Sequence, residues 1–284
     1  MASGRYGKCG SASAIVLYNT SMNTRHTELV RLPLPAAGAL QVYLSHAKVR
    51  DERAVVYVHG FASTRTSLKA EALEAACARR GWTFVSFDFR GHGESTGTLL
   101  EMTGSGLLDD MRAVHEYLIG LGVPRLCPVG SSMGGWAAVW FTLRHPNSVP
   151  ACVLIAPAFD FLHKRTASLT EEQQANWKQT GRLRVQNEWV DAELGYGIVE
   201  ESDQFPMEEL TARLSRPTLI FHGFGDTAVP PRGSFDFVER AAYPEMELRF
   251  YKNGDHRLLA YREEMAETAC EFFARHVGGN VVTS

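Results

Sequence analysis

The sequence predicts an α/β protein in which helices cover both faces of a mostly parallel sheet. From residue 25 onward, short apolar runs that end at glycine alternate with longer stretches of helical spacing. Strands that alternate with helices in this way are typical of βαβ units. The chain has 284 residues, of which 45% are hydrophobic, so one large domain with a sizeable buried core is expected.

The first predicted elements are a β-rich section and a βα unit. Segments 28–33 and 40–45 have the pattern of a hairpin, and "AVVYVHG" (Ala54–Gly60) is a short apolar run typical of a buried strand. Ser67–Arg80 carries apolar side chains at helical spacing, and Gly81 is a suitable stop for that helix. The further predicted strands are Thr83–Gly91, Leu126–Gly130, Ala151–Ala158, Thr218–Gly223 and Met246–Tyr251, and the further helices lie within Gly106–Leu121, Met133–His145, Arg232–Ala241 and Tyr261–His276.

One segment, residues 159–216, interrupts the alternation. It is longer than the connection between two neighbouring strands requires. Within it "SLTEEQQANWKQT" predicts an amphipathic helix, and "RLRVQNEW" is expected to pair with "GYGIVEE" as a hairpin. Because the insertion follows a core strand at the carboxyl edge of the sheet, we expect a small lid rather than a second domain.

Composition and charge exclude several classes of partner. The formal net charge is −3 with no basic cluster, so neither nucleic acid nor an anionic membrane surface is expected as a partner. The longest apolar stretches are too short for a membrane span. The five cysteines are scattered singly without a C-x-x-C pair, which predicts no disulfide framework, no metal site and a reducing compartment.

Residues 1–24 are expected to be an N-terminal extension to a domain that covers 25–284. The first 27 residues contain several serines and a few basic residues but no Asp or Glu, which faintly resembles a mitochondrial transit peptide. A disordered leader is the favoured interpretation. A cytoplasmic location is therefore predicted, with a mitochondrial one as the alternative.

The stretch "VGSSMGGW" contains the pattern G-x-S-x-G, with Ser132 at its centre. A strand precedes it and a helix follows, which is the context of a nucleophile elbow. Such a turn holds the serine at strained backbone angles so that its hydroxyl stands above the sheet, and the flanking glycines leave room for the neighbouring backbone. A tight strand-to-helix turn without chemistry is the alternative.

A serine nucleophile needs a base and an acid that orients the base. In this architecture the acid and then the histidine follow the serine along the chain. Asp226 comes just after a core strand in "FHGFGD", and His256 follows the next strand in "KNGDHRL". Asp255 and Asp160 are the rival acids. Asp226 is preferred over Asp255 because a neighbour in sequence cannot readily fold back onto the His256 imidazole.

Acyl transfer also needs two N–H donors for the oxyanion of the tetrahedral intermediate. The backbone N–H of Met133, the residue after the serine, is one predicted donor. The other is the N–H of Phe61 in "HGFAS", which follows a strand. His59 and Gly60 have the simpler interpretation of a strand terminator.

Several motifs together resemble the α/β-hydrolase-fold serine hydrolases. They are "VHGF", "FDFRGHGES", "GSSMGGW", "HGFGDTAVP" and "GDHRL", in the family's order, and the resemblance covers about residues 25–276. More narrowly, "HGFASTRTSLKA" and "DHRL" resemble the branch with mitochondrial acyl-protein thioesterases and acyl-glucuronide esterases, and small-cap carboxylesterases are also similar. The resemblance implies the α/β-hydrolase fold with a mostly parallel eight-stranded sheet, a small cap at 159–216 and no cofactor.

The predicted function is hydrolysis of small, soluble carboxylic acyl esters, because the insertion is too short and too charged for a lipase lid. Trp136, Phe159, Phe161 and Phe224 are the predicted walls of the acyl pocket, with ordinary core packing as the alternative. An acyl thioesterase, an acyl-glucuronide esterase and a peptidase remain as enzymatic alternatives. A non-catalytic ligand-binding protein on the same fold is the alternative from another class. The sequence leaves monomer and dimer open.

Overall fold

The structure is a computed structural model that describes residues 16–17, 25–35, 38–48, 50–167, 169–186 and 191–277. At its centre the described strands form a nine-stranded sheet of order β1-β2-β3-β5-β4-β6-β7-β10-β11. The strands of this sheet are β1 (Val16–Leu17), β2 (Arg25–Pro33), β3 (Ala39–Ala47), β4 (Arg53–Val58), β5 (Thr83–Phe87), β6 (Arg125–Ser131), β7 (Cys152–Ile155), β10 (Thr218–Gly223) and β11 (Met246–Tyr251).

The eight strands from β2 onward form the mostly parallel sheet that the sequence predicts. Strands β5, β4, β6, β7, β10 and β11 run parallel to one another, β3 pairs antiparallel with β5, and β2 and β3 are the predicted antiparallel hairpin. The two residues of β1 pair antiparallel with β2. The rest of the predicted extension at 1–24 lies outside the described residues.

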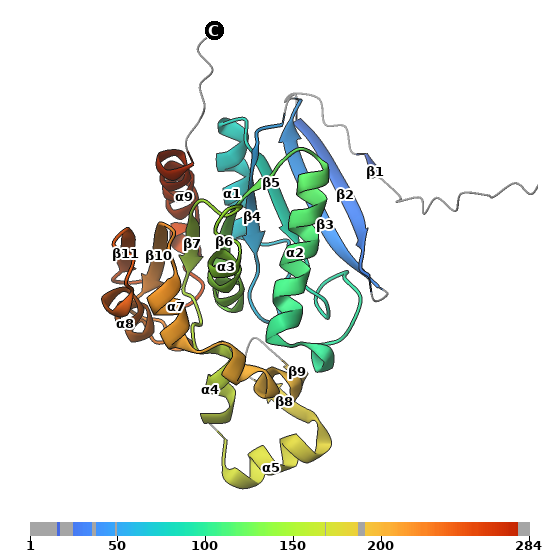
Figure 1. The fold of residues 1–284 in the computed structure, drawn as a ribbon, viewed down its shortest axis with the longest axis vertical. Helices are drawn as coiled ribbons and strands as arrows, with labels where there is room; N and C mark the ends of the chain where they lie inside the picture. The colour runs from blue at the N-terminus through green and yellow to red at the C-terminus, as the bar shows by residue number, and fades with distance from the viewer. Residues whose placement is uncertain are drawn as a thin grey trace, which may run out of the picture.

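Helices cover both faces of this sheet because successive residues of each central strand point to opposite sides. In β4, Val56 and Val58 pack with the core under α2, α3 and α8, whereas Val55 and Tyr57 pack with α1 and α9. Figure 1 shows the helices on either side of the sheet. These helices are α1 (Leu68–Arg79), α2 (Gly104–Gly120), α3 (Met133–Arg144), α8 (Arg232–Arg240) and α9 (Arg262–His276).

Most of the segment between β7 and β10 lies beyond one end of the sheet, around α4, α5, β8 and β9, whereas its last helix, α7, lies beside α3 and α8 (Figure 1). Its elements are α4 (Phe161–Ala167), α5 (Glu171–Thr180), β8 (Arg182–Gln186), β9 (Asp191–Gly195), α6 (Gly197–Glu200), η2 (Ser202–Gln204) and α7 (Met207–Arg213). The predicted helix is α5, but the partner of β8 differs from the prediction. The sequence suggested the stretch from Gly195, whereas β8 pairs with Asp191–Gly195 and the chain turns into α6 directly afterwards.

Several further boundaries differ from the prediction, and the strand expected over Ala151–Ala158 is limited to Cys152–Ile155. The strand expected to reach Gly91 ends at Phe87. The Asp88 N–H still donates to Gln41 of β3, but the Phe89 N–H donates to the imidazole of His59 instead of to a neighbouring strand. Helix α2 begins earlier than predicted, where Thr103 caps it by accepting from the Gly106 N–H. No helix in the described ranges combines the length and apolarity that crossing a bilayer requires.

Candidate active site

Ser132 occupies the turn between β6 and α3 in a strained conformation, with φ 56° and ψ −117°. Four backbone hydrogen bonds hold it there. Its N–H donates to Ile155 O at 2.9 Å, and its carbonyl accepts from the N–H groups of Gly135 at 2.9 Å, Trp136 at 3.2 Å and Ala158 at 3.1 Å. Strain of this kind costs on the order of 1–3 kcal/mol and persists only where the surrounding structure enforces it.

The glycines around Ser132 are required by backbone contacts. A Cβ on Gly134 would lie 2.1 Å from Val58 O, and one on Gly130 would lie 2.2 Å from Gly134 O. The first turn of α3 therefore packs directly on the end of β4, which only glycine allows.

The three residues predicted for proton transfer lie in one hydrogen-bonded chain. The Ser132 Oγ lies 3.1 Å from His256 Nε2, and His256 Nδ1 lies 2.7 Å from Asp226 Oδ2. Because the Asp226 carboxylate accepts, His256 carries its proton on Nδ1 and presents the lone pair of Nε2 to the hydroxyl. This arrangement can take the proton of Ser132 without any rearrangement.

Asp226 is buried, and both of its oxygens are hydrogen-bonded. Oδ1 accepts from the backbone N–H groups of Ala228 at 2.9 Å and Val229 at 2.8 Å, while Oδ2 accepts from His222 at 3.1 Å as well as from His256. Burial by itself would raise the pKa of the carboxyl, but the hydrogen bonds from His222, His256 and Val229 outweigh it and hold the pKa well below its usual range.

His222 is a residue that sequence reasoning missed. Its Nε2–H faces both Asp226 Oδ2 and Val229 O, the latter at 3.0 Å, so Nδ1 is the acceptor for the Ser234 hydroxyl at 2.7 Å. The His222 ring thus helps to hold the Asp226 carboxylate in the orientation in which it accepts from His256. The only signal in the sequence was the spacing of four residues between His222 and Asp226.

The loop after β4 brings the other predicted residues to the elbow. A Cβ on Gly60 would lie only 3.3 Å from Ser132 Cβ, so this backbone runs beside the serine. Met133 is the first residue of α3, where backbone N–H groups have no intrahelical partner. The half-buried Phe61 packs on His92 and on Phe161, with ring centroids 6.2 and 6.1 Å apart.

Two anchors to which the sequence analysis gave no role hold this loop, and the first is His59. His59 Nε2 accepts from the Phe89 N–H at 3.1 Å, so its Nδ1–H donates to Gly60 O at 2.8 Å. Burial, reinforced by the charge of nearby His92, lowers the pKa of His59 to about 3, so this ring is neutral at ordinary pH.

Arg65 and Asp88 form the second anchor. The buried Asp88 carboxylate accepts from the Arg65 backbone N–H at 2.6 Å and is paired with the Arg65 guanidinium, which also contacts Glu94. The loop after β4 is thereby joined to the loop after β5. These contacts depend on the approach of two distant loops, which no local pattern predicts.

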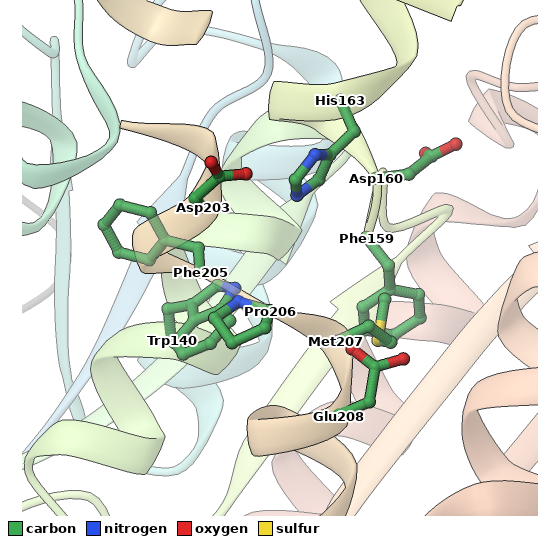
Figure 2. Close-up of a pocket in the computed structure, with 9 residues that line it drawn as sticks. All are labelled: Trp140, Phe159, Asp160, His163, Asp203, Phe205, Pro206, Met207 and Glu208. Carbon is green, nitrogen blue, oxygen red and sulfur yellow. The ribbon is translucent and has the colours of Figure 1, made fainter. Parts of the chain in front are cut away.

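The four predicted substrate-binding residues lie in different places. A cavity of about 320 Å³ lies between the end of α3 and the insertion, and its lining residues are Trp140, Phe159, Asp160, His163, Asp203, Phe205, Pro206, Met207 and Glu208 (Figure 2). Phe159 therefore lines it. Trp136 is buried behind it against Phe205, with ring centroids 4.9 Å apart, and Phe161 lies against Phe61. Phe224 is 59% exposed and packs on Phe250, away from the cavity lining.

The walls of this cavity are aromatic, whereas its rim is polar. In Figure 2 the rings of Trp140 and Phe205 lie on one side and Phe159 with Met207 on the other, while the Asp160 carboxylate points away from them. Trp140 is eight residues beyond Ser132, which corresponds to about 12 Å along α3. Ser132 is not among the residues that line the cavity, which therefore lies beside the hydroxyl rather than at it.

The rival acids are placed differently from Asp226. Asp255 Oδ1 accepts from the Leu258 N–H at 2.8 Å, and Asp160 is exposed at the cavity. In the described part of the chain, no group of three or more His, Cys, Asp or Glu side chains is arranged to hold a metal ion.

Comparison with known proteins agrees with this architecture. The family model described as alpha/beta hydrolase fold matches residues 53–256. The mouse palmitoyl-protein thioesterase ABHD10, mitochondrial, is 27% identical over 208 residues, which span 72% of this chain and 69% of that protein. The human protein of the same name is 24% identical over 220 residues, which span 76% of this chain and 71% of that protein.

Solved structures show the same fold. The alpha/beta hydrolase domain-containing protein 10 from mouse superimposes with a TM-score of 0.73 at 22% identity and covers 92% of this chain and 99% of its own. Est1E from Butyrivibrio proteoclasticus with bound ferulic acid gives a TM-score of 0.73 at 22% identity over 84% of this chain and 96% of its own. With this fold, this elbow and a family model that matches most of its length, the chain belongs to the alpha/beta hydrolase fold family.

Proposed function

We propose that this protein is a serine hydrolase that cleaves carboxylic acyl esters through an acyl-enzyme on Ser132. The proposal is carried by the hydrogen-bonded chain from Ser132 Oγ to His256 at 3.1 Å and from His256 to Asp226 at 2.7 Å. The mouse relative named as a palmitoyl-protein thioesterase supports acyl transfer of this type.

In the proposed reaction, Ser132 Oγ attacks the ester carbonyl carbon as its proton passes to His256 Nε2. The N–H groups of Met133 and Phe61 stabilise the resulting oxyanion, and Asp226 stabilises the imidazolium and holds its tautomer. His256 then gives the proton to the departing alcohol. Water, deprotonated by the same imidazole, releases the acid and restores the Ser132 hydroxyl.

Hydrolysis of acyl thioesters is the second candidate function. The specific observation in its favour is the similarity to the mouse protein named as a palmitoyl-protein thioesterase. The same residues serve this reaction, with a thiol as the leaving group. Matched series of p-nitrophenyl esters and acyl thioesters of increasing chain length separate the two, since a strong preference for long thioesters would select the thioesterase.

The cap and the acyl pocket are part of the proposal. We assign the cap to residues 159–216 and the acyl pocket to the region of Phe159, Trp136 and Phe161. The apolar cavity walls support this assignment. Phe224 is not included because its exposed ring packs on Phe250.

The location of the protein is proposed from its relatives. The mouse relative is named as mitochondrial, which favours the mitochondrial alternative over the cytoplasmic one. Fusion of residues 1–24 to a fluorescent protein tests this directly. Import of the fusion into mitochondria is expected, and a diffuse signal would favour the cytoplasmic location instead.

A fluorophosphonate probe tests the central proposal. The wild-type protein is expected to be labelled, and Ser132→Ala is expected to lose the label together with ester turnover. Equal labelling of both proteins, or of neither, would overturn the proposal, and absence of labelling with retained ligand binding would indicate a non-catalytic binding protein.

A further inference from the structure

Lys69 lies behind the elbow, on the opposite side of the sheet from the cavity. It belongs to the first turn of α1, and its ammonium donates to Ser131 Oγ at 2.7 Å. Ser131 is the residue immediately before the proposed nucleophile. A charge-assisted hydrogen bond of this length is among the stronger contacts that a lysine makes.

The surroundings of the Lys69 ammonium contain few polar groups. Lys69 borders a void of only about 10 Å³, which is too small for a ligand. Apart from the Arg262 side chain, its neighbours there are mostly aliphatic: Leu73, Val129, Ile155, Met265, Ala266 and Ala269. The phenol of Tyr57 from β4 also lies there and is hydrogen-bonded with Ser67 and Ser131.

This contact joins two segments that carry the proposed oxyanion donors. The loop with Phe61 leads directly into α1, whose first turn is capped by Ser67 through the Ala70 N–H at 3.2 Å. The elbow with Met133 follows Ser131 directly. Because Lys69 is anchored in the first turn of α1 and bonded to Ser131, it fixes the distance between the loop and the elbow.

We propose that Lys69 is a positioning residue that sets the geometry of the oxyanion site through its charged hydrogen bond to Ser131. This inference rests on the proposed function. Lys69 does not touch the reacting atoms, so it acts through the backbone on either side of it. A displacement of one donor by a few tenths of an ångström is enough to weaken oxyanion stabilisation.

The protonation state of Lys69 gives the proposal a specific signature. Burial lowers the pKa of its ammonium to about 8, assisted by the positive charge of Arg257 and opposed by the carboxylates of Asp255 and Asp226. The ammonium is therefore intact at pH 7 and is lost as the pH rises through about 8. The positioning contact should weaken over the same interval.

The test is the pH dependence of the fluorophosphonate labelling rate between pH 6 and 10, with Ser132→Ala as the background. For the wild type, the rate is expected to fall above about pH 8. Lys69→Met should be slower by about tenfold at pH 7 and should lack this fall. Lys69→Arg, whose charge persists across the range, should recover much of the rate and remain flat.

Lys48→Met is the matched control. Lys48 is exposed and directly follows β3. The last residues of β3 lie beside the first residues of β5, so Lys48 is at the opposite end of the strands from the site. Its profile should equal that of the wild type. Ser131→Ala, which removes the acceptor, should be slower at pH 7, and combining it with Lys69→Met should add little.

Each result decides the inference. If the labelling rates of Lys69→Met and Lys69→Arg depend on pH as the wild-type rate does, including the fall above about pH 8, the role of Lys69 is overturned while the hydrolase proposal remains intact. A wild type that is not labelled at all overturns the hydrolase proposal instead. If Lys69→Met does not fold, as judged by thermal unfolding, the decision passes to Lys69→Arg, in which a persisting alkaline fall contradicts the proposal.

Discussion

At the scale of single residues, Asp226 shows how a buried carboxylate is kept ionised. Desolvation opposes its charge, yet two backbone N–H groups and two imidazoles donate to its oxygens. With every acceptor position occupied, the ionised form is favoured in the folded protein. The same contacts fix the direction in which His256 presents its lone pair.

Replacing the acid tests this role. Asp226→Asn keeps the shape but no longer selects the tautomer in which His256 Nε2 accepts, so kcat at neutral pH should fall on the order of 10³- to 10⁴-fold. The measurement is turnover of a p-nitrophenyl ester. Asp109→Asn, an exposed carboxylate of α2, serves as the control and should stay within twofold. A loss below about tenfold in Asp226→Asn would assign the orienting role to another acid.

The same carboxylate predicts a change in acid stability. Because the pKa of Asp226 is lower in the folded state than in the unfolded chain, its ionisation stabilises the protein above about pH 4, and this contribution is lost as the pH falls further. The difference in unfolding free energy between wild type and Asp226→Asn should therefore shrink between pH 5 and pH 3. Urea unfolding at each pH measures it, and two parallel stability curves would contradict the assignment.

At the scale of elements, the junction of β6 with α3 was predictable because its motif, glycine two residues before and two residues after Ser132, is contained within five residues. The structure gives the reason for each glycine: a Cβ on Gly130 would meet Gly134 O within the turn, and one on Gly134 would meet Val58 O of β4. The hairpin in the insertion was less predictable. Both "DAELG" and "GYGIV" are short segments that could follow β8, and the choice depends on the packing of β9 against η1 (Leu99–Glu101), which lies far away in the sequence.

The packing of α3 on β4 makes a direct stability prediction. A Cβ on Gly134 would meet Val58 O at 2.1 Å and His59 O at 2.4 Å, so Gly134→Ala must displace the helix and should cost at least about 3 kcal/mol of stability or abolish folding. Gly233→Ala is the matched control, because a Cβ there meets nothing within 4 Å in α8. It should be neutral or stabilising by up to about 1 kcal/mol in chemical denaturation. Equal effects of the two substitutions would refute the close contact.

At the scale of the whole molecule, the alternation of strands and helices predicted the sheet, and the sheet predicted where Ser132, Asp226 and His256 meet. Carboxyl ends of parallel strands share one edge, so residues that follow three different strands were expected together. The supports of that site were less predictable. The contacts of Arg65 and those around the cavity arise where segments distant in sequence approach each other. The partners of His222 are near in sequence, but only the folded loop after β10 shows that its ring bonds Asp226. Phe224 shows that an aromatic residue near a site residue can still face solvent.

The packing of the insertion can be weakened without changing the residues that carry the proposed reaction. Trp177 of α5 is fully buried, its indole N–H donates to Leu194 O in β9 at 3.2 Å, and its ring packs on Tyr196 at 5.4 Å. Replacing it with alanine removes about 3–5 kcal/mol of local packing. Since β6, α3 and the loops that carry His256 and Asp226 lie outside this segment, their geometry should persist.

Trp177→Ala should therefore loosen residues 159–216 while the elbow remains reactive. Hydrogen exchange is expected to lose protection in α5 and β9 but not in β4 or β6. Fluorophosphonate labelling and turnover of an acetyl ester should stay within a few-fold of wild type, whereas KM for long acyl chains should rise about tenfold if the segment covers the acyl group. Glu172→Ala, an exposed change on the same helix, is the control. A uniform loss across all chain lengths would show that the segment supports the reacting groups themselves, and an unchanged KM series would remove it from substrate binding.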